Sequence, residues 1–436
     1  MMRAKTNEES ADGTSMTPTN EQENQRAGLN GWQHGAVFAL ACLLMVTRRP
    51  DAVFHAQFLH EDGHVWFADV YNFGWWAGIW RIYEGYHHVF PRVGAALALL
   101  VPLSLAPLAM NLMGMFSQVL PVNLLLSSRS SEWGSLRYRA ALGGIYLALP
   151  NAREMLNSIS QAQWPLTLCA FLLIVAKPAK GIAGRVFDVL VLLFAGLTGP
   201  QCVFLLLMAL YLGWRQGERW RFAGAGVLGI ACVIQTWGLL SGGFASRPHF
   251  ALGASLTMLV RLVAGHVFLG TLLGANALAL HSSPKFLTFM CCVLAGGVAM
   301  VALCIRRSTE PLRLFALLTA VLLAVSLISP TVYPPRGITV WQLLAAAGGI
   351  RYWYFPCIVC AWLLLTGVSK GSDALKAVCG VLLLLMCFGV VGNWRIPAAP
   401  ESHWAEDAMR FETLPAGTTA TFPENPPGWN ITLTKH

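Results

Sequence analysis

The densest group of chemically useful side chains in this chain of 436 residues is the run His60-Glu61-Asp62-Gly63-His64. Five of the 11 histidines lie in the surrounding segment, residues 48–88, which is also rich in tryptophan and tyrosine. Adjacent carboxylates beside imidazoles suit proton transfer or cation binding. The aromatics alone fit a belt at a membrane surface, but two neighbouring charges there need a further reason. Glu61 and Asp62 are therefore the candidate catalytic residues.

The same run matches the zinc-protease pattern His-Glu-x-x-His, in which His60 and His64 would bind zinc and Glu61 would activate water. A third ligand would come from the next polar segment: Glu84, His87 or His88. Two features oppose this interpretation. Gly63 weakens a ligand helix by about 1 kcal/mol relative to alanine, and Asp62 places a charge where such helices bury an uncharged residue. The zinc protease stays the less favoured alternative.

Candidate cations for a phosphate group occur in two later segments: His87, His88, Arg92, Arg336 and Arg351. Arginine suits two-pronged contact with phosphate oxygens. Arg351 lies between a Gly-Gly pair and an aromatic run and is favoured, whereas Arg92 and Arg336 fit ordinary snorkelling equally well. Gln163 and Trp164 suit hydrogen bonding and stacking with a sugar, and they suit helix capping just as well.

Three of these segments resemble the C-type membrane glycosyltransferase superfamily, whose members use polyprenyl-phosphate sugars: Glu61-Asp62-Gly63, Glu84-Gly85-Tyr86-His87-His88 and Phe90-Pro91-Arg92. In that superfamily the first extracytoplasmic loop carries one or two acidic residues, and a segment beneath it re-enters the membrane. Similarity to uncharacterised bacterial members extends to residues 157–164, 351–356 and 425–429. The resemblance covers the general layout of residues 32–395, and the chain departs from better-known members in lacking an Asp-x-Asp motif.

The resemblance implies a transferase that moves a sugar from a polyprenyl-phosphate donor to an extracytoplasmic glycan or lipid acceptor. Either Glu61 or Asp62 would be the general base. The other would hold a sugar hydroxyl or a divalent cation such as Mg²⁺ or Mn²⁺, although the missing Asp-x-Asp leaves metal dependence open. The substrate-binding residues it implies are His64, Tyr86, His87, His88, Arg92, Gln163, Trp164, Arg336, Arg351 and Tyr352.

The elements that must position these residues are membrane helices. Apolar side chains make up 56% of the chain and charged ones 12%, against about 25% charged residues in soluble domains. At about 20 residues for each span, the hydrophobic length supplies around ten crossings. The net charge of +9 comes from short basic clusters between apolar runs, which indicates membrane topology rather than nucleic-acid binding. We expect an all-α polytopic protein in a lipid bilayer, in a bacterial inner membrane.

Five basic clusters define the expected topology: Arg129/Arg137/Arg139, Lys177/Lys180/Arg185, Arg215/Arg219/Arg221, Arg306/Arg307/Arg313 and Lys370/Lys376. If each lies in the cytoplasm, the chain crosses out and back between successive clusters. Residues 89–127 then contain one crossing, at about residues 108–126, after a helix on or near the outer surface. The total is about eleven crossings, with a cytoplasmic N-terminus and an extracytoplasmic C-terminus.

The predicted organisation has three parts: a disordered cytoplasmic tail (residues 1–30), a transmembrane domain (31–394) whose first extracytoplasmic loop (48–88) is helical, and an extracytoplasmic tail (395–436). The last part is too polar to span a membrane and too aromatic for a disordered end. We expect a short helix at residues 402–411 and a remainder that folds over the outer loops.

The best acidic and basic candidates lie in different outer loops, so we expect Glu61 and Asp62 to face an outward cavity shared with residues 333–354. A lipid or polysaccharide transporter, or a flippase, is the main alternative from another class. Its signature is ionisable residues near the middle of several spans, and the predicted spans are nearly free of Asp and Glu. The sequence also shows no internal repeat of the kind common in transporters.

Overall fold

The structure is a computed structural model that describes residues 28–243, 250–277, 286–346 and 350–436. Nearly all of the predicted cytoplasmic tail, residues 1–30, lies outside these described residues. The side chain of Asn30 accepts from the Gln33 N–H, and the Gln33 side chain accepts from the Asn30 N–H, both at 3.0 Å. This reciprocal cap satisfies backbone donors that a helix start leaves open, so the first long helix begins at Gly31.

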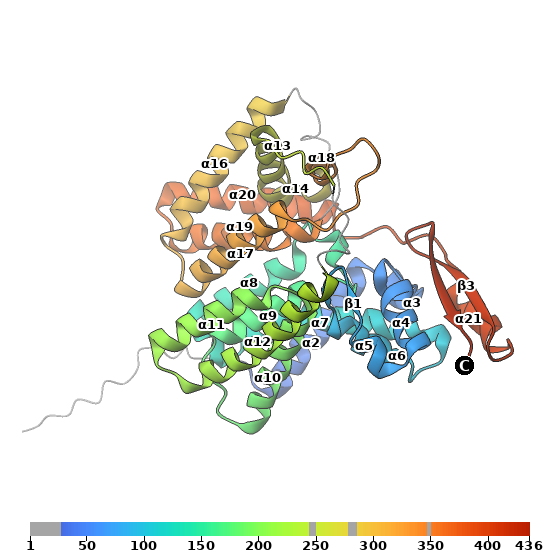
Figure 1. Ribbon diagram of the computed structural model, residues 1–436. Helices are drawn as coiled ribbons and strands as arrows, with labels where there is room; N and C mark the ends of the chain where they lie inside the picture. The colour runs from blue at the N-terminus through green and yellow to red at the C-terminus, as the bar shows by residue number, and fades with distance from the viewer. Residues whose placement is uncertain (1–27, 244–249, 278–285, 347–349) are drawn as a thin grey trace, which may run out of the picture.

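The described chain is mostly helical, as expected for a backbone that must satisfy its own hydrogen bonds in lipid. The longer helices are α2 (Gly31–Arg48), α6 (Val89–Ala98), α7 (Ala106–Leu126), α8 (Leu136–Ala148), α9 (Gln163–Val175), α10 (Ile182–Thr198), α11 (Cys202–Gln216), α12 (Arg219–Gly238), α16 (Leu287–Ile305), α17 (Glu310–Ile328), α19 (Ile350–Lys370) and α20 (Asp373–Gly392). Figure 1 shows them as one bundle, with the C-terminal strands at one side.

Shorter helical elements connect the long ones. They are α3 (Asp51–Phe54), η1 (Asp62–Phe67), α4 (Ala68–Phe73), α5 (Trp75–Ile79), η2 (Leu103–Leu105), η3 (Ser128–Trp133), η4 (Arg153–Met155), η5 (Leu239–Gly243), α13 (Leu256–Arg261), η6 (Leu262–Leu269), α14 (Gly270–Leu273), η7 (Gly274–Ala277), α18 (Val340–Ala346) and α21 (Trp404–Glu412). The strands are β1 (Ile82–Tyr83), β2 (Tyr86–His87), β3 (Thr419–Glu424) and β4 (Trp429–Thr434).

Among the described residues, seven helical segments are long and apolar enough to cross a bilayer: Leu103–Leu126, Arg219–Ser241, Leu256–Leu273, Leu287–Ile305, Glu310–Ile328, Arg351–Lys370 and Asp373–Gly392. A helix of about 18 residues reaches roughly 27 Å, close to the thickness of a hydrocarbon core. Three further apolar helices are shorter: Val89–Ala98, Gln163–Val175 and Cys202–Gln216. Several helices thus suit a membrane, and the prediction of about eleven crossings stays a prediction.

The five basic clusters lie together at one end of the bundle, which we call the basic end. Contacts join the loop that carries each cluster to the loop that carries the next. The Lys177 N–H donates to the Arg129 carbonyl, Arg221 donates to the Ala176 carbonyl, and Arg215 pairs with Glu310. Arg307 donates to the Lys370 carbonyl, and Lys370 Nζ lies over the Tyr138 ring. The end also contains a half-buried ion pair, in which Arg129 donates to both carboxylate oxygens of Asp188 at 2.8 and 2.6 Å.

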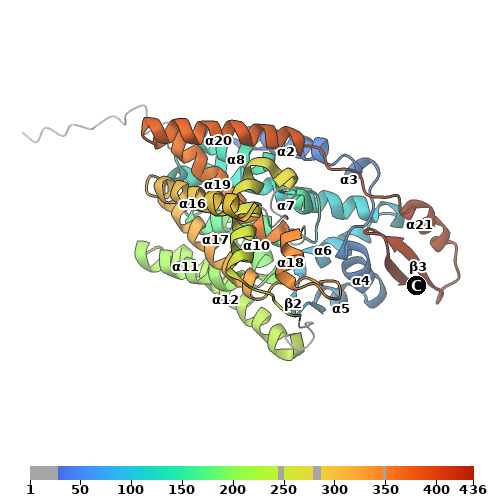
Figure 2. The same ribbon diagram turned by 90° about the horizontal axis from the view of Figure 1, so that it is seen from above.

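Residues 49–105 form a cap over the opposite end of the bundle, where Figures 1 and 2 show α3, α4, α5 and α6 beside the C-terminal strands. Helix α6 stays within this cap, and the long helix α7 begins only at Ala106. Residues 89–127 therefore hold one long helix preceded by one short helix, as the charge pattern predicts. The interior of the cap is apolar and aromatic, and Phe58, Trp66 and Phe67 are fully buried there.

The cap also contains a small β-hairpin that the prediction of a purely helical loop missed. Strands β1 and β2 pair antiparallel, with Ile82 opposite His87 and Tyr83 opposite Tyr86. The two turn residues, Glu84 and Gly85, have φ values of 52° and 88°. Positive φ at both central residues is the geometry of a two-residue turn whose twist matches the flanking strands. The hairpin brings Tyr83, Tyr86 and the histidines after it to one side of the cap.

The apolar segment α13–η6–α14 runs across the capped end of the bundle, although it is long enough to span. At its start, the Leu252 carbonyl accepts from the Trp341 N–H, and the Trp341 indole donates to the carbonyl of Leu327 at the end of α17. At its finish, the Leu273 carbonyl accepts from the amide of Asn393 at the end of α20. Helices α17 and α20 both start at the basic end, so both ends of this segment lie at the opposite end.

The C-terminal tail folds into α21 and the antiparallel pair β3–β4, which pairs from Thr419 with Thr434 to Glu424 with Trp429. Helix α21 is close to the helix predicted at residues 402–411. The strands correct the all-α prediction. Their side chains alternate, with the buried Phe422, Ile431 and Leu433 facing the cap and exposed threonines facing away, and this period of two is the pattern of a half-buried strand.

Candidate functional site

A cavity of about 670 Å³ lies between the cap and the helix ends that face it. Seven of the twelve predicted catalytic and substrate-binding residues line it: Glu61, His64, Tyr86, His88, Trp164, Arg351 and Tyr352. They come from the cap, from the start of α9 and from the start of α19. The tail contributes Trp429, and the ends of α12 and α17 contribute apolar side chains, Leu239 and Val325 among them.

Glu61 reaches the cavity because the chain turns sharply just before it. His60 has a φ of 56°, a left-handed conformation that ends the preceding extended segment. The His60 N–H donates to the carbonyl of Asn425 in the tail at 2.7 Å, and Leu59 forms a bridge to the same residue. Glu61 then occupies the cap position of η1, its side chain is only partly exposed, and it belongs to the cavity wall.

Asp62 points away from the cavity into the protein interior. Its side chain is buried, and its Oδ1 accepts from the backbone N–H of Ser160 at 3.1 Å and from the Ser160 hydroxyl at 2.5 Å. That hydroxyl also accepts from the Trp66 indole at 2.7 Å. Burial raises the pKa of Asp62 to about 8, and the nearby carboxylates of Glu424 and Glu61 add to the rise. Asp62 is therefore mainly protonated at neutral pH and holds Ser160, so of the two adjacent acids only Glu61 lines the cavity.

The zinc-protease geometry is not formed by His60 and His64. His60 lies outside the helix, and the Nδ1 of His64 lies 3.0 Å from Glu424 Oε2 and 3.1 Å from the His60 carbonyl. In the described ranges, no group of three His, Cys, Asp or Glu side chains is arranged to hold a metal ion. His60 and His64 therefore do not form the zinc site of the protease pattern, whereas a divalent cation beside Glu61 or Asp62 stays a prediction, since Mg²⁺ often binds through only one or two protein carboxylates.

Arg351 faces the cavity from the start of α19. Its Nη1 donates to Glu154 Oε1 at 2.9 Å, and its Nη2 donates to the Thr331 carbonyl at 2.6 Å. The guanidinium carbon lies 5.2 Å from the centre of the Tyr352 ring. Since an arginine has five N–H donors, these two bonds leave donors for a ligand anion. The negative charge of Glu61 also stabilises the positive charge of Arg351, so these two candidate residues interact electrostatically.

His88 packs against two aromatic rings in the cavity wall. Its ring lies 4.6 Å from the Trp66 ring and 4.2 Å from the Tyr86 ring, measured between centroids. Burial, and next the charge of Arg92, lowers the pKa of His88 well below its ordinary value of 6.5. The imidazole is therefore neutral at pH 7. Neither ring nitrogen has a hydrogen-bond partner of good geometry among the described residues.

Other residues of the wall also hold buried polar atoms without a partner. Within the described part of the chain, the side-chain oxygens of Gln161 and Gln201 and the indole nitrogen of Trp164 make no hydrogen bond. Buried polar atoms are normally paired, and each unpaired one costs about 1–3 kcal/mol. A ligand with several hydroxyl groups would supply such partners, and the indole and tyrosine rings would cover its apolar faces.

Five predicted site residues do not line this cavity: Asp62, His87, Arg92, Gln163 and Arg336. Arg92 is fully buried because it pairs with Asp69 at 2.7 Å and donates to the Gly78 carbonyl. The backbone of His87 is held on both sides by the amide of Gln235, and Arg336 is exposed. Of the five proposed phosphate ligands, only His88 and Arg351 thus face the cavity.

Sequence reasoning missed two residues that organise the site, Ser160 and Glu424. Ser160 lies within residues 157–164, where the sequence is similar to the bacterial members, but no pattern there marks the serine itself. Glu424 does have a local signal, because it lies two residues after Phe422 on a strand whose buried positions alternate. A carboxylate in the buried register of such a strand needs a partner inside the protein. Its partner is the segment that follows Glu61.

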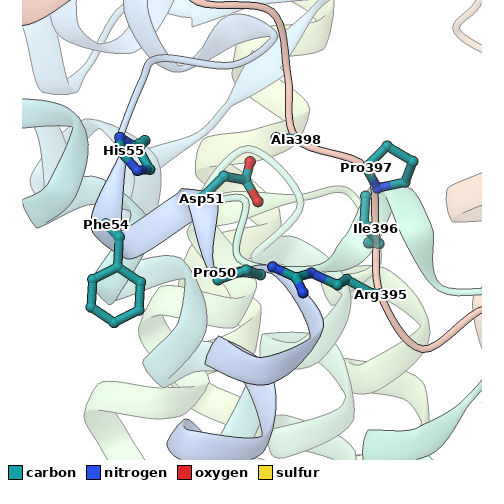
Figure 3. Close-up of a pocket in the computed structure, with 8 residues that line it drawn as sticks. All are labelled: Pro50, Asp51, Phe54, His55, Arg395, Ile396, Pro397 and Ala398. Carbon is teal, nitrogen blue, oxygen red and sulfur yellow. The ribbon is translucent and has the colours of Figure 1, made fainter.

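A second hollow, of about 660 Å³, lies on the surface between α3 and residues 395–398 (Figure 3). Its polar side chains are Asp51, His55 and Arg395. Asp51 is paired with Arg49 at 3.6 Å, and Phe54 is largely exposed beside it. This hollow gathers no combination of groups comparable with the cavity under the cap.

The cavity therefore combines the partly buried carboxylates of Glu61, Glu84 and Glu154, an arginine with spare donors, a neutral imidazole, aromatic walls and unpaired amide oxygens. Such a set can take a proton from a hydroxyl group and hold an anion in the same space. Comparisons of the chain with models of known protein families, with curated proteins and with solved structures find no match.

Proposed function

We propose that this protein is a membrane glycosyltransferase that moves a sugar from a polyprenyl-phosphate donor to a glycan or lipid acceptor outside the cytoplasm. One observation carries the proposal: Glu61 and Arg351 lie in the walls of one aromatic cavity at the capped end of an apolar helix bundle. Glycosyl transfer from a lipid phosphate needs a base for the acceptor hydroxyl and a cation for the departing phosphate. It does not need a metal ion that activates water.

In the proposed reaction, Glu61 takes the proton of an acceptor hydroxyl group. The hydroxyl oxygen forms a bond to the anomeric carbon of the donor sugar, and the bond between that carbon and the phosphate oxygen breaks. The electron pair leaves with the polyprenyl phosphate, whose added negative charge the free N–H donors of Arg351 stabilise. A single displacement of this kind inverts the anomeric configuration and needs no nucleophile from the protein.

The other wall residues have places in this scheme. The unpaired side-chain atoms of Gln161, Gln201 and Trp164 would hydrogen-bond sugar hydroxyls, and neutral His88 would do so without competing for the phosphate. The apolar side chains of Leu239 and Val325 suit the first isoprene units of the donor. The scheme assigns no step to a divalent cation.

We also propose the orientation in a bacterial inner membrane. The positive-inside rule places the basic end in the cytoplasm, so the cavity and the tail lie outside. Helices α2, α7 to α12, α16, α17, α19 and α20 would then cross the bilayer, which makes eleven crossings. The contacts that hold both ends of α13–η6–α14 at the capped end support leaving this segment out of the count.

The function is tested with the full chain in lipid nanodiscs and a panel of polyprenyl-phosphate-linked hexoses and pentoses. Release of polyprenyl phosphate is measured with mixed glycan acceptors. We expect Glu61→Gln and Arg351→Gln to lower turnover at least 100-fold, while the exposed Glu406→Gln and Arg336→Gln stay at the wild-type rate. A wild-type protein that binds polyprenyl phosphate, turns over no donor and moves the lipid across vesicles would instead be a transporter.

A further inference from the structure

The carboxylate of Glu424 lies buried between the tail and the segment that carries Glu61. Its Oε1 accepts from the Gly63 N–H at 2.8 Å, and its Oε2 accepts from the His64 N–H at 3.0 Å. The same Oε2 lies 3.0 Å from His64 Nδ1. The Glu424 side chain has no exposed surface, so these bonds are not shared with solvent.

These contacts are those of a helix cap supplied from a distance. The first N–H groups of a helix lack partners inside it, and usually the side chain at the cap position accepts from the second or third of them. In η1 the cap position is Glu61, whose side chain makes no such bond. Gly63 and His64 are the second and third residues of the helix, and Glu424 accepts from both.

Tight packing keeps the two segments in this register. A Cβ at Gly63 would come within 2.4 Å of the Ile431 side chain and within 2.7 Å of Glu424 Oε1. The tail also holds the residue before Glu61, since the Asn425 carbonyl accepts from the His60 N–H at 2.7 Å. Glu61 is thus fixed on both sides by neighbouring residues of β3 and its turn.

We propose that Glu424 is a positioning residue, which caps η1 in place of Glu61 and so leaves the Glu61 carboxylate to the cavity. Without this cap, Glu61 turns back to accept from the unpaired N–H groups of Gly63 and His64, and its carboxylate leaves the cavity. Through Glu424, the C-terminal tail helps to position the catalytic base. This inference rests on the proposed role of Glu61 as the base.

The decisive variant is Glu424→Gln, because the amide keeps the shape of the side chain, loses its charge and turns an NH₂ group toward one backbone N–H. We expect kcat for sugar transfer to fall about 10- to 100-fold, with the donor KM changed less than about threefold, because misplacing a catalytic group acts on the reaction step. Glu424→Asp, which keeps the charge, should recover part of kcat. Glu412→Gln removes an exposed carboxylate from the same tail and serves as the matched control.

A second measurement does not depend on activity. Carbodiimide labelling of the full chain, followed by mass spectrometry, reports the reactivity of Glu61, with Glu84 of the same cavity as the internal reference. We expect the labelling ratio of Glu61 to Glu84 to change at least threefold in Glu424→Gln and not in Glu412→Gln. If the wild-type protein turns over no donor, the proposed function fails. The labelling ratio still tests whether Glu424 positions Glu61.

Two results would overturn the positioning role. One is an unchanged kcat and an unchanged labelling ratio in Glu424→Gln. The other is joint loss of turnover, thermal stability and polyprenyl-phosphate binding in both Glu424→Gln and Glu424→Asp, which would make Glu424 a general stability residue. Loss of kcat with lipid binding retained and partial recovery in Glu424→Asp supports the inference.

Discussion

Asp62 and Ser160 form a two-point contact that links the cap to the segment before α9: the carboxylate oxygen of Asp62 accepts from both the N–H and the hydroxyl of Ser160. The indole of Trp66 completes the chain by donating to the same hydroxyl. The two adjacent acidic residues thus differ in function. Glu61 lines the cavity, whereas Asp62 holds Ser160 and so positions the start of α9.

Stability should decline as the pH rises from about 4 to 8. The pKa of Asp62 is about 8 in the folded protein against an ordinary value of 3.8, so between these values the folded state binds a proton that the unfolded state has lost, and raising the pH disfavours folding. Glu424 acts in the same direction, since burial raises its pKa too. Thermal unfolding in nanodiscs across this range should show the decline, and Asp62→Asn should flatten it. An equally steep decline in Asp62→Asn would refute the assignment.

Replacing Ser160 should destabilise the cap. Ser160→Ala removes the hydroxyl that donates to Asp62 and accepts from Trp66, leaving two buried groups short of a partner, at a cost of about 1–3 kcal/mol. Ser158→Ala is the matched control, because the Ser158 hydroxyl is buried and has no hydrogen-bond partner among the described residues, so its loss should be neutral. The comparison is made by denaturant or thermal unfolding, and equal effects of the two variants would contradict the linking role of Ser160.

The tail should contribute to stability through its buried strand face. Ile431 is fully buried against the cap, so Ile431→Ala should cost about 2–5 kcal/mol of unfolding free energy. Its neighbour Thr432 is exposed, and Thr432→Ala should change the unfolding free energy by less than about 0.5 kcal/mol. A tail that merely hangs from the last helix would make the two variants indistinguishable, and deletion of residues 413–436 would leave activity unchanged.

Replacing Trp164 should weaken binding of the sugar part of the donor and leave binding of its lipid part unchanged. Trp164→Phe keeps a ring against Phe355 and removes the unpaired indole N–H, so we expect the KM for the sugar donor to rise about 2- to 10-fold, the value of one hydrogen bond. Binding of polyprenyl phosphate without a sugar should stay unchanged. Trp237→Phe, at an exposed position on α12, is the control. Equal weakening of both ligands would place Trp164 outside the sugar site.

The proposed orientation makes a separate prediction. A reporter fused after residue 436 should be extracytoplasmic, and one inserted near Arg307 should be cytoplasmic, since Arg307 belongs to the basic end. Substituted-cysteine labelling from each side of sealed vesicles gives an independent check. A cytoplasmic C-terminus would refute the proposed eleven crossings and would place the cavity on the opposite side of the membrane.

The sequence was informative where one local property decides the structure. Long apolar runs indicate helices such as α16 and α20, and the charge clusters predict the single long helix in residues 89–127. The cavity that holds both Glu61 and Arg351 follows from the same pattern, because loops at one end of an antiparallel bundle are neighbours. The role of each residue as base or cation remains a prediction.

What the sequence could not supply are contacts between distant segments. The burial of Arg92 depends on Asp69, and the inward turn of Asp62 depends on Ser160, neither of which any spacing rule connects. The left-handed conformation of His60 removes it from the helix that a His-Glu-x-x-His pattern assumes. The strands of the tail could have been predicted, because their buried positions alternate with exposed ones. The buried positions are Phe422, Glu424, Ile431 and Leu433.

The cap that Glu424 provides also sets the moment at which the protein becomes competent. Glu424 follows the described long helices in the chain, so in the proposed orientation it is synthesised and translocated after those helices. Until then η1 lacks the acceptor for its first N–H groups. A chain that is still being synthesised, or one truncated within β3, would sit in the membrane with its helices in place and its base misplaced. Maturation of the site is thereby tied to the synthesis and translocation of β3.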